Sequence, residues 1–554
     1  FDANVPILKY LASLGMLLGK KNIHHQYAHC WRCKNPIIYR ATEQWFASVD
    51  GFREAALQAI HTDVQWIPAW GEPRIHNMVA DRHDWCISRQ RVWGVPIPIF
   101  YCAECHEPLV TDATIEAVAT CFEKEGSDAW WKHEADELLP KGTKCPKCGH
   151  PHFTKEKDIM DVWFDSGSSH MGVLKTRPEL EWPCAMYLEG SDQHRGWFQS
   201  SLLTSVAATG KAPYRSVLTH GYVVDGDGRK MSKSVGNVIA PQDIIKQYGA
   251  DIVRLWVASA DYKQDIRISK LILKQLTEIY RKIRNTIRYI LGNTSDFDYA
   301  KDKVAFADMQ ELDQWALMRL QKLKKEVGTA YEEYEFHVLF HAIHNFCAVE
   351  MSSFYLDIIK DRLYASRQDD QIRRSAQTAM YEILNDLVVM LAPVLSFTME
   401  EVWQFMKKPA DAPESVQMQT WPEVKEEYIN ETLEAKYDNF IALRGEVTRV
   451  LEGHRQAKTI GNSLEAKLVL YAEGEALQIL RSVEKDLAAL LIVSQVVLEE
   501  GAAAGEEATD RADLKVTVKP ADGHKCERCW TYSETVGTDP EHPELCARCA
   551  AVVK

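Results

Sequence analysis

The residues Gly221-Tyr-Val-Val-Asp-Gly-Asp-Gly-Arg-Lys-Met-Ser-Lys-Ser234 carry the most informative motif of this chain. A short apolar run ends in two Asp-Gly steps, which favour a tight turn. Three cations follow within five residues, Arg229, Lys230 and Lys233. Small residues leave such a loop free to move, and lysines can hold a polyphosphate. A solvated hairpin tip is the alternative. A calcium loop needs a carboxylate at its twelfth position, where Gly236 stands.

The five residues Lys230-Met-Ser-Lys-Ser234 are identical to the KMSKS signature of class I aminoacyl-tRNA synthetases. Two motifs lie upstream, Asp161-Val-Trp-Phe-Asp-Ser-Gly167 and Glu189-Gly-Ser-Asp-Gln-His-Arg-Gly-Trp-Phe198, and Thr219-His-Gly221 precedes the loop. Together they resemble the isoleucyl enzymes of this class rather than the valyl or leucyl ones. The resemblance extends along essentially the whole chain, which looks like the C-terminal portion of a bacterial-type isoleucyl-tRNA synthetase.

The resemblance implies an isoleucine–tRNA ligase that makes isoleucyl-adenylate and transfers the amino acid to tRNA(Ile). Lys230 and Lys233 are the expected catalytic residues, which stabilise the departing pyrophosphate together with Mg2+. The expected ATP-binding residues are Glu189, Gly190, Asp192, His220, Gly221, Lys230, Met231, Ser232, Lys233 and Ser234. The expected residues of the isoleucine or isoleucyl-adenylate pocket are Trp163, Glu189, Gln193 and Trp197. Indole rings suit this pocket because they give a rigid apolar wall at low cost in entropy.

Part of the family's pattern is missing from this sequence. The chain begins at Phe1 without an initiator methionine, inside a predicted helix from Val5 to Leu18. The His-x-Gly-His signature is not found, and only a trailing edge of the editing domain is expected, at residues 1–40. We therefore expect a fragment that is inactive without the missing N-terminal half. Without the editing domain it would not clear misloaded valine either, a step that the family needs because one methylene contributes only about 1–3 kcal/mol in a hydrophobic pocket.

Ten of the 14 cysteines fall into five Cys-x-x-Cys pairs. In a chain without a recognisable export signal, this pattern favours metal over disulfides. Two zinc sites are predicted, with the ligands Cys526, Cys529, Cys546 and Cys549 in the tail and Cys102, Cys105, Cys145 and Cys148 around an insertion. His106 or His150 could replace one thiolate of the second site. The pair Cys30 and Cys33 has no partner pair left, and we expect it to be empty or redundant.

Long amphipathic helices are predicted after about residue 265, at 311–330, 336–362, 370–391 and 432–455. An earlier helix is predicted from the helical spacing of the apolar residues between Ile272 and Ile290, and it carries Lys274, Arg281 and Arg288 at intervals of seven, opposite its apolar stripe. This spacing is typical of a solvated face, whereas the resemblance favours contact with tRNA. The expected tRNA-binding residues are Arg281, Arg288, Arg528 and Trp530. Packing under the zinc site is an equal alternative to base stacking for Trp530.

His337, His341 and His344 repeat at helical spacing. They could form a metal site, but phenylalanines interleave with them and no carboxylate completes the set. Helix packing or an RNA-facing role is the favoured interpretation.

The predicted fold is multidomain: the α/β second half of a Rossmann-type class I core, then a helical anticodon-binding domain and a C-terminal zinc module. The expected segments are an editing edge (1–40), a core segment (41–100), a zinc-containing insertion (101–160), the second half of the Rossmann core (161–225), the KMSKS and stem-contact region (226–290), the anticodon-binding domain (291–460), a junction with a polar linker at 499–513 (461–513), and the zinc module (514–554).

The 554 residues are 46% hydrophobic, enough for several cores. The net charge of −14 argues only weakly against nucleic acid, since a local basic stripe suffices for binding. No apolar run approaches the roughly 20 residues of a membrane span. We therefore expect a cytoplasmic monomer with isoleucine, ATP and tRNA(Ile) as partners and no membrane. The alternatives are a non-catalytic tRNA-binding fragment with zinc modules and a valyl-tRNA synthetase.

Overall fold

A computed structural model describes residues 2–30, 33–233, 235–501 and 507–554. The chain divides into two compact units, Phe1–Thr219 and His220–Lys554, and each is considered by itself. Ser234, one of the expected ATP-binding residues, lies outside the described residues. Within the described ranges, no helix is both long and apolar enough to cross a membrane.

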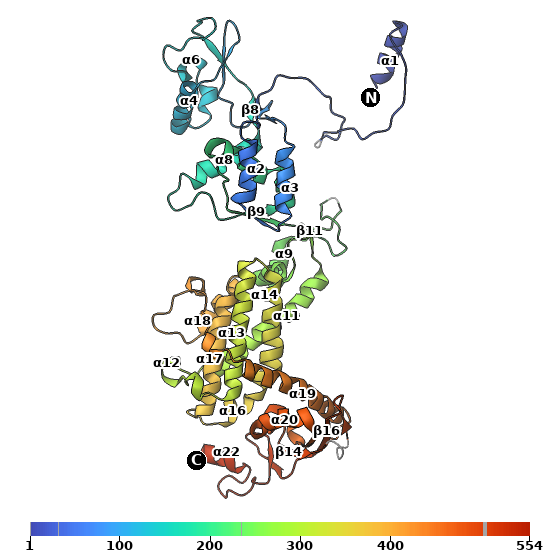
Figure 1. Cartoon of the computed structure of the whole chain (residues 1–554), viewed down its shortest axis with the longest axis vertical. Helices are drawn as coiled ribbons and strands as arrows, with labels where there is room; N and C mark the ends of the chain where they lie inside the picture. Colours follow the sequence, from blue (N-terminus) through green and yellow to red (C-terminus); the bar gives the residue numbers. More distant parts are fainter. Residues whose placement is uncertain (1, 31–32, 234, 502–506) are drawn as a thin grey trace. The chain divides into compact units, whose positions relative to one another are not determined.

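The core of the first unit is a three-stranded sheet covered by helices. Its strands are β2 (Gln65–Ile67), β10 (Ser216–His220) and β9 (Tyr187–Gly190), in the order β2-β10-β9, with β10 parallel to β2. The helices are α2 (Arg53–Thr62), α3 (Gly71–Ala80) and α8 (Trp197–Thr209) (Figure 1). Most of α8 is buried, because Phe198, Leu202 and Val206 all enter one hydrophobic core. The expected α/β class is confirmed for this unit.

The insertion has a small hydrophobic core of its own. Strands β6 (Pro108–Leu109), β5 (Phe100–Cys102) and β7 (Phe153–Lys155) form an antiparallel sheet beside α4 (Asp112–Glu125), α5 (Ala129–Lys132) and α6 (Ala135–Leu138). Phe100 and Trp130 are fully buried between these elements, with their ring centroids 5.0 Å apart. The insertion is therefore packed on its own side chains as well as around its cysteines.

The N-terminal helix is shorter than predicted. Helix α1 spans Asn4–Ser13 instead of continuing to Leu18, because Gly15 adopts a left-handed φ of 68° that a helix does not accommodate. Val5, Ile7 and Tyr10 are all more than half exposed on α1.

Long helices dominate the second unit, as expected. They are α11 (Lys270–Asn293), α13 (Glu311–Glu332), α14 (Phe336–Asn345), α17 (Gln371–Leu391), α18 (Ser396–Phe405) and α19 (Glu431–Gln456) (Figure 1). The apolar stripe of α11 is buried, whereas Lys274, Arg281 and Arg288 are exposed. The helix predicted over 336–362 is not continuous. It widens into π-type turns over Phe346–Tyr355 and restarts as α15 (Leu356–Ile358) and α16 (Lys360–Ala365).

The region expected to be a junction and linker contains a sheet instead. Its strands β14 (Gln495–Glu500), β13 (Ala466–Ala472), β16 (Leu514–Pro520) and β15 (Glu507–Ala508) lie in that order, covered by α20 (Gly474–Ser482) and α21 (Leu487–Leu491). Strand β13 pairs in parallel with β14 and antiparallel with β16. The linker expectation for 499–513 is wrong at its described ends, because Glu499 and Glu500 extend β14 and residues 507–508 form β15. The valines and leucines of β13 and β16 form the buried apolar face of this sheet. The sheet was not predicted from the sequence because polar residues flank these strands.

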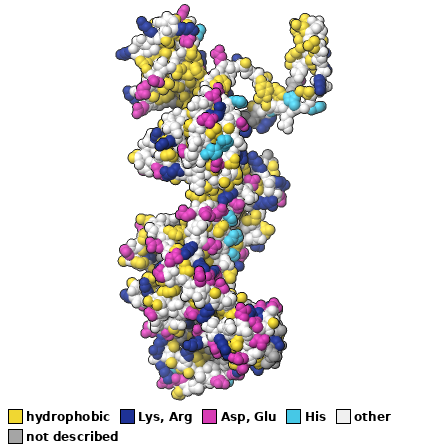
Figure 2. Space-filling model, in the orientation of Figure 1, with side chains coloured by type: hydrophobic (Ala, Val, Ile, Leu, Met, Phe, Trp, Pro, Cys, Tyr) yellow, Lys and Arg dark blue, Asp and Glu magenta, His cyan; other side chains and the backbone are white. Residues whose placement is uncertain are grey.

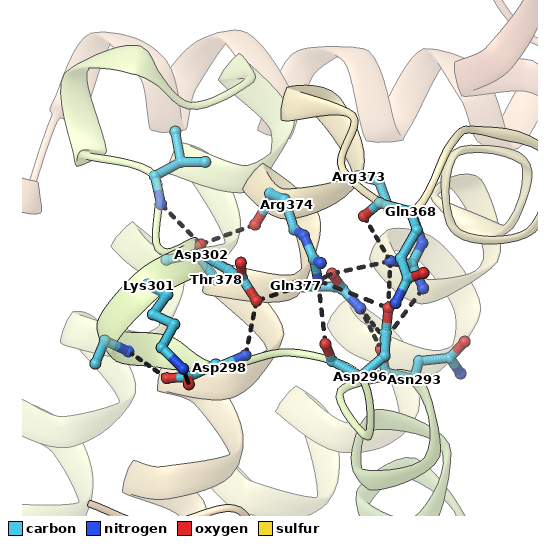
Figure 3. A network of polar contacts seen from close by, with 12 residues as sticks. Asn293, Asp296, Asp298, Lys301, Asp302, Gln368, Arg373, Arg374, Gln377 and Thr378 are labelled. Atoms are coloured by element: carbon cyan, nitrogen blue, oxygen red, sulfur yellow. Dashed lines mark hydrogen bonds and ion pairs between the residues drawn. The ribbon is translucent and has the colours of Figure 1, made fainter.

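A polar network fixes the end of α11 against the start of α17 (Figure 3). The Asp296 carboxylate accepts hydrogen bonds from Arg373 Nη1 at 2.7 Å and from Gln377 Nε2 at 2.8 Å. Gln377 Nε2 also donates to the carbonyl of Asn293, the last residue of α11. Burial opposes ionisation of Asp296, but the hydrogen bonds from Arg373 and Gln377 lower its pKa to about 2.

We predict that Asp296→Asn lowers the free energy of unfolding by about 1.5–3 kcal/mol, the usual contribution of charged hydrogen bonds. Because the folded pKa is depressed, the contribution is present above about pH 4, the ordinary carboxyl pKa, and is lost as the pH falls toward about 2. Chemical denaturation at several pH values measures it. Asp308→Asn, at an exposed position, is the control. Equal stability of the two variants at neutral pH would contradict the prediction.

Candidate functional site

Helix α7 (Val162–Gly167) presents one of the two expected pocket tryptophans. The carboxylate of Asp161 caps this helix by accepting a hydrogen bond from the Trp163 backbone N–H at 3.3 Å. The same carboxylate accepts hydrogen bonds from Trp85 Nε1 at 3.0 Å and from Arg89 Nη2 at 2.9 Å. Asp161 is thus held in place while the Trp163 side chain remains 42% exposed.

The second tryptophan and the expected amide lie directly beside Trp163. Gln193 Oε1 accepts a hydrogen bond from the Trp197 backbone N–H at 2.9 Å, and Trp197 Nε1 donates to the Ser166 carbonyl at 3.0 Å. A Cβ on Gly196 would lie 2.6 Å from Gln193 Oε1 and 2.9 Å from the Trp163 ring. Only glycine permits this approach. Trp163, Gln193 and Trp197, three of the expected pocket residues, therefore meet around Gly196.

Beside Trp163 and Gly196 opens a cavity of about 390 Å³. Arg82 and Gln199 line it, and the Arg82 guanidinium donates to Gln199 Oε1. Burial lowers the pKa of Arg82, and the nearby Asp161 carboxylate partly offsets this effect. These polar wall residues were missed in the sequence, because Arg82 and Gln199 lie 117 positions apart and belong to no motif.

The expected acidic residues lie at the end of β9. Glu189 and Asp192 are exposed, and each accepts a hydrogen bond close by, from the Gly190 backbone N–H at 3.2 Å and from Gln193 Nε2 at 3.2 Å, respectively. Gly190 itself is buried. Both carboxylates are therefore open to solvent.

His220 and Gly221 begin the second unit. The Gly221 N–H donates to the Tyr262 carbonyl at 2.8 Å, and a Cβ at this position would lie 2.2 Å from the Gln264 carbonyl oxygen. Glycine is therefore required by the close approach of two backbones. His220 Nδ1 lies 2.8 Å from the Gly221 carbonyl, which makes Nδ1 the donor and leaves Nε2 free to accept.

The cationic loop is organised by one carboxylate. Strand β11 (Val223–Val224) leads into Asp225, which accepts from the backbone N–H of Asp227 at 3.1 Å, from that of Arg229 at 2.8 Å and from Asn237 Nδ2 at 2.9 Å. Asn237 also accepts from the Ser232 N–H at 2.9 Å and donates to the Lys230 carbonyl at 3.2 Å. Asp225 at the start of the loop and Asn237 at its end are therefore connected by a hydrogen bond.

The two lysines expected to be catalytic lie in solvent. Lys230 and Lys233 are exposed, whereas the Met231 side chain packs against the helical core. The hydrogen bond from Asn237, supported by those from Arg229, lowers the pKa of Asp225 to about 2 although burial opposes this. The sequence indicated a mobile loop; the structure adds the Asp225–Asn237 clasp.

Both predicted cysteine sets converge. In each set of four, all the sulfur atoms lie within 4.8 Å of one another. The distance from Cys102 Sγ to Cys148 Sγ is 3.5 Å, and that from Cys529 Sγ to Cys546 Sγ is 3.8 Å. Tetrahedral Zn–S bonds of about 2.3 Å require sulfurs about 3.8 Å apart, so both sets fit zinc. Because four thiols complete the insertion site, neither His106 nor His150 is needed as a ligand.

Four of the five Cys-x-x-Cys pairs adopt the same backbone knuckle. In each, the first cysteine's carbonyl accepts from the N–H four residues on, and its own N–H donates five residues on. The residue after the second cysteine is left-handed in all four: Lys34 (φ 62°), His106 (57°), Gly149 (75°) and Trp530 (64°). The described residues at Cys30, Lys34 and Asn35 thus share the hydrogen bonds of the metal-site pairs, and the expectation that the pair at Cys30 and Cys33 is empty or redundant stays a prediction.

The tail module docks on the helices of its own unit. Arg548 forms two bonds with Asp361, at 2.5 and 2.7 Å, and Arg367 Nη2 donates to the Ala551 carbonyl at 2.7 Å. Arg528 Nη2 donates to the Ala365 carbonyl at 3.2 Å. Trp530, by contrast, is 60% exposed, with Lys525 Nζ 5.3 Å from its ring centroid. The exposure favours base stacking over packing under the zinc site.

The other expected RNA contacts are on the helical surface. Arg281 is 63% exposed and forms an ion pair with Glu278 at 2.7 Å, and Arg288 is exposed. On the face in view, acidic and basic side chains are interspersed over these helices (Figure 2). Among the described residues, His337, His341 and His344 belong to no group of converging metal ligands. Phe340 stacks on His344 at a centroid distance of 6.4 Å, as a packing role predicts.

We predict that Asp225→Asn loosens the cationic loop and accelerates tryptic cleavage after Lys230 and Lys233 several-fold. The clasp contributes above about pH 4 and is lost as the pH falls toward about 2, since the pKa of Asp225 is depressed. Limited proteolysis at neutral pH measures the rate. Asp227→Asn, which removes only a solvent-exposed ion pair with Arg229 in the same turn, should cleave at nearly the parental rate.

We predict that Cys148→Ser and Cys549→Ser each remove one tightly held zinc ion and leave the other. Metal analysis after dialysis against a chelator tests this, with Cys184→Ser as the thiol control. Loss of both ions from either variant, or of neither, would contradict independent sites.

Three family profiles match this chain. That of the class I tRNA synthetases (I, L, M and V) matches residues 17–269, the anticodon-binding domain of tRNA ligase matches 313–470, and the zinc finger found in FPG and IleRS matches 523–552. Isoleucine--tRNA ligase from Moorella thermoacetica is 57% identical over 557 residues, covering 100% of this chain and 60% of that protein. The enzyme of the same name from Caldicellulosiruptor saccharolyticus is 57% identical, with 100% and 59% covered.

Among solved structures, Mycobacterium tuberculosis methionyl-tRNA synthetase in complex with methionyl-adenylate aligns with a TM-score of 0.48 and 19% identity, over 68% of this chain and 65% of that one. The chain spans about 60% of the length of the curated relatives it matches. This chain is therefore similar along its whole length to isoleucine--tRNA ligases, and it carries class I tRNA synthetase, anticodon-binding and zinc-finger domains.

Proposed function

We propose that this chain is part of an isoleucine–tRNA ligase that activates isoleucine with ATP and transfers it to tRNA(Ile). The observation that carries the proposal is the 57% identity to isoleucine--tRNA ligases along the entire chain. The pocket around Gly196 supports it, because two indole rings and an amide suit an aliphatic amino acid with a charged backbone. The proposed compartment is the cytoplasm, and the proposed state is a monomer.

The proposed first step is adenylation. The isoleucine carboxylate, already ionised at neutral pH, attacks the α-phosphorus of ATP; a P–O bond forms to the carboxylate and the bond to the pyrophosphate oxygen breaks. No general base is needed, so positioning and charge stabilisation account for the catalysis. Lys230 and Lys233 are proposed to stabilise pyrophosphate, and their exposed ammonium groups on a clasped backbone are suited to that role.

The remaining nucleotide contacts are proposed from the motifs. Gly190, His220, Gly221, Met231, Ser232 and Ser234 would surround ATP, with Glu189 and Asp192 near its ribose and the substrate ammonium group. The free Nε2 of His220 can accept a hydrogen bond from an adenine amino group. Mg2+, when bound to the phosphates, would neutralise part of their charge.

In the proposed second step, a terminal ribose hydroxyl of tRNA(Ile) attacks the acyl carbon of the adenylate, and AMP leaves. The match of residues 313–470 to an anticodon-binding domain supports tRNA as the partner. Trp530 is exposed for stacking, and Arg281 and Arg288 are exposed for phosphate contacts. Arg528 would act indirectly, because its guanidinium donates to the Ala365 carbonyl and thereby docks the tail.

We predict isoleucine-dependent ATP–pyrophosphate exchange when this chain is combined with the N-terminal portion that its relatives carry. Lys230→Ala and Lys233→Ala should each lower kcat about 10²–10³-fold, as expected for losing one electrostatic contact to a transition state. The KM for isoleucine should change little, because the lysines do not touch the amino acid. Lys246→Ala, an exposed lysine outside the loop, is the control.

The same assay separates the alternatives. A preference for valine over isoleucine would assign the chain to the valyl enzymes. Binding of tRNA without exchange by the combined portions would reject the ligase proposal in favour of a non-catalytic binding fragment.

Trp163→Ala should raise the KM for isoleucine by about 10–100-fold, on the scale of a lost aromatic wall.

A further inference from the structure

A third group of converging ligands lies in the insertion, separate from its four cysteines. Cys121 and Glu125 are one helical turn apart on α4, and His133 directly follows α5. One donor atom of each lies within 4.8 Å of the others, and His133 Nε2 is 3.0 Å from Glu125 Oε2. We propose that Cys121, Glu125 and His133 bind a divalent transition-metal ion such as Zn2+.

The backbone of α4 is fixed before any ion binds. Thr111 caps the helix through a reciprocal pair of hydrogen bonds with Thr114. On the inner face, Val118 is 2% exposed and Phe122 packs against the core of the insertion. Cys121 and Glu125 are therefore presented by a rigid helix at the i, i+4 spacing that places two side chains on one face.

The segment that carries His133 is anchored just as firmly. Trp130 is fully buried and its Nε1 donates to the Glu156 carbonyl at 3.0 Å. Lys155 Nζ donates to the carbonyls of both Trp130 and His133. Strand β7 and the core of the insertion therefore fix the position of the imidazole beside α4. Binding of an ion would not have to order three flexible loops.

The second ring nitrogen of His133 also faces a carboxylate. His133 Nδ1 lies 3.8 Å from Glu137 Oε2. Histidines that bind metal usually donate their other ring N–H to a carboxylate, which fixes the tautomer with Nε2 toward the ion. Glu137 can serve this purpose while its Oε2 also accepts from the Glu134 N–H at 2.7 Å.

The donor set indicates the kind of ion. Ca2+ and Mg2+ prefer oxygen ligands, whereas a thiolate with an imidazole favours zinc and similar borderline ions. Three protein ligands leave a fourth position for water, so the ion should exchange more readily than those in the two four-cysteine sites. Binding forms an S–metal bond as the Cys121 thiol releases its proton, and Nε2 must be unprotonated, so affinity should rise with pH.

The test uses the full chain with its four-cysteine sites filled with zinc and excess metal removed by a chelator. Titration with Co2+ should then show one further equivalent, with a thiolate-to-metal absorption band. Cys121→Ser, Glu125→Gln and His133→Asn should each weaken this equivalent at least tenfold, and Glu137→Gln about tenfold. Glu123→Gln, a carboxylate in the same turn of α4, and Cys184→Ser should bind Co2+ as the parent does.

Retention of tight zinc in every variant verifies that the insertion is folded. The proposal is overturned if the parent chain takes up no further equivalent, or if Cys121→Ser and His133→Asn bind it unchanged. No step of the test uses aminoacylation, so its outcome is independent of the proposed ligase activity.

Discussion

The geometry of the cationic loop in the second unit depends on the carboxylate of Asp225. A loop of small residues that carries exposed lysines would otherwise adopt many backbone conformations. Fixing the backbone of each residue in one conformation costs about 1–2 kcal/mol of entropy. Asp225 and Asn237 reduce that freedom by tying the turn, the lysine backbone and the loop's exit together. The cations remain in water, where they can meet a polyphosphate, and only the backbone beneath them is fixed.

In the first unit, the side chains around Gly196 are positioned mainly by steric fit instead of by charge. Gly196 has no Cβ, so Trp163 and Gln193 can close over it from two different elements. Asp161 supplies the rigidity, since its carboxylate holds a helix N-terminus, an indole and a guanidinium at once. Trp163 and Gln193 are therefore held in place around Gly196 by steric fit and by the hydrogen bonds of Asp161.

Features that depend on neighbours in the chain were predictable from the sequence, and those that depend on tertiary proximity were not. Helix α11 followed from its apolar period, and both four-cysteine sets from the spacing of their pairs. The sheet around β13 was missed because charged residues flank its strands and hide the alternation. The Asp225–Asn237 clasp and the Arg82–Gln199 pair join residues that no local pattern links. The helix over 336–362 was predicted from its amphipathic pattern, which does not report where turns widen.

The left-handed residue that ends each cysteine knuckle has a consequence for Trp530. Gly149 occupies this position in the insertion without strain, whereas an L-amino acid there costs about 1–2 kcal/mol. The tail nevertheless carries its largest aromatic side chain at that point and exposes it. A glycine would make the module more stable and would leave it without an aromatic surface. The tail therefore keeps an exposed aromatic surface at a cost in stability that a glycine would avoid.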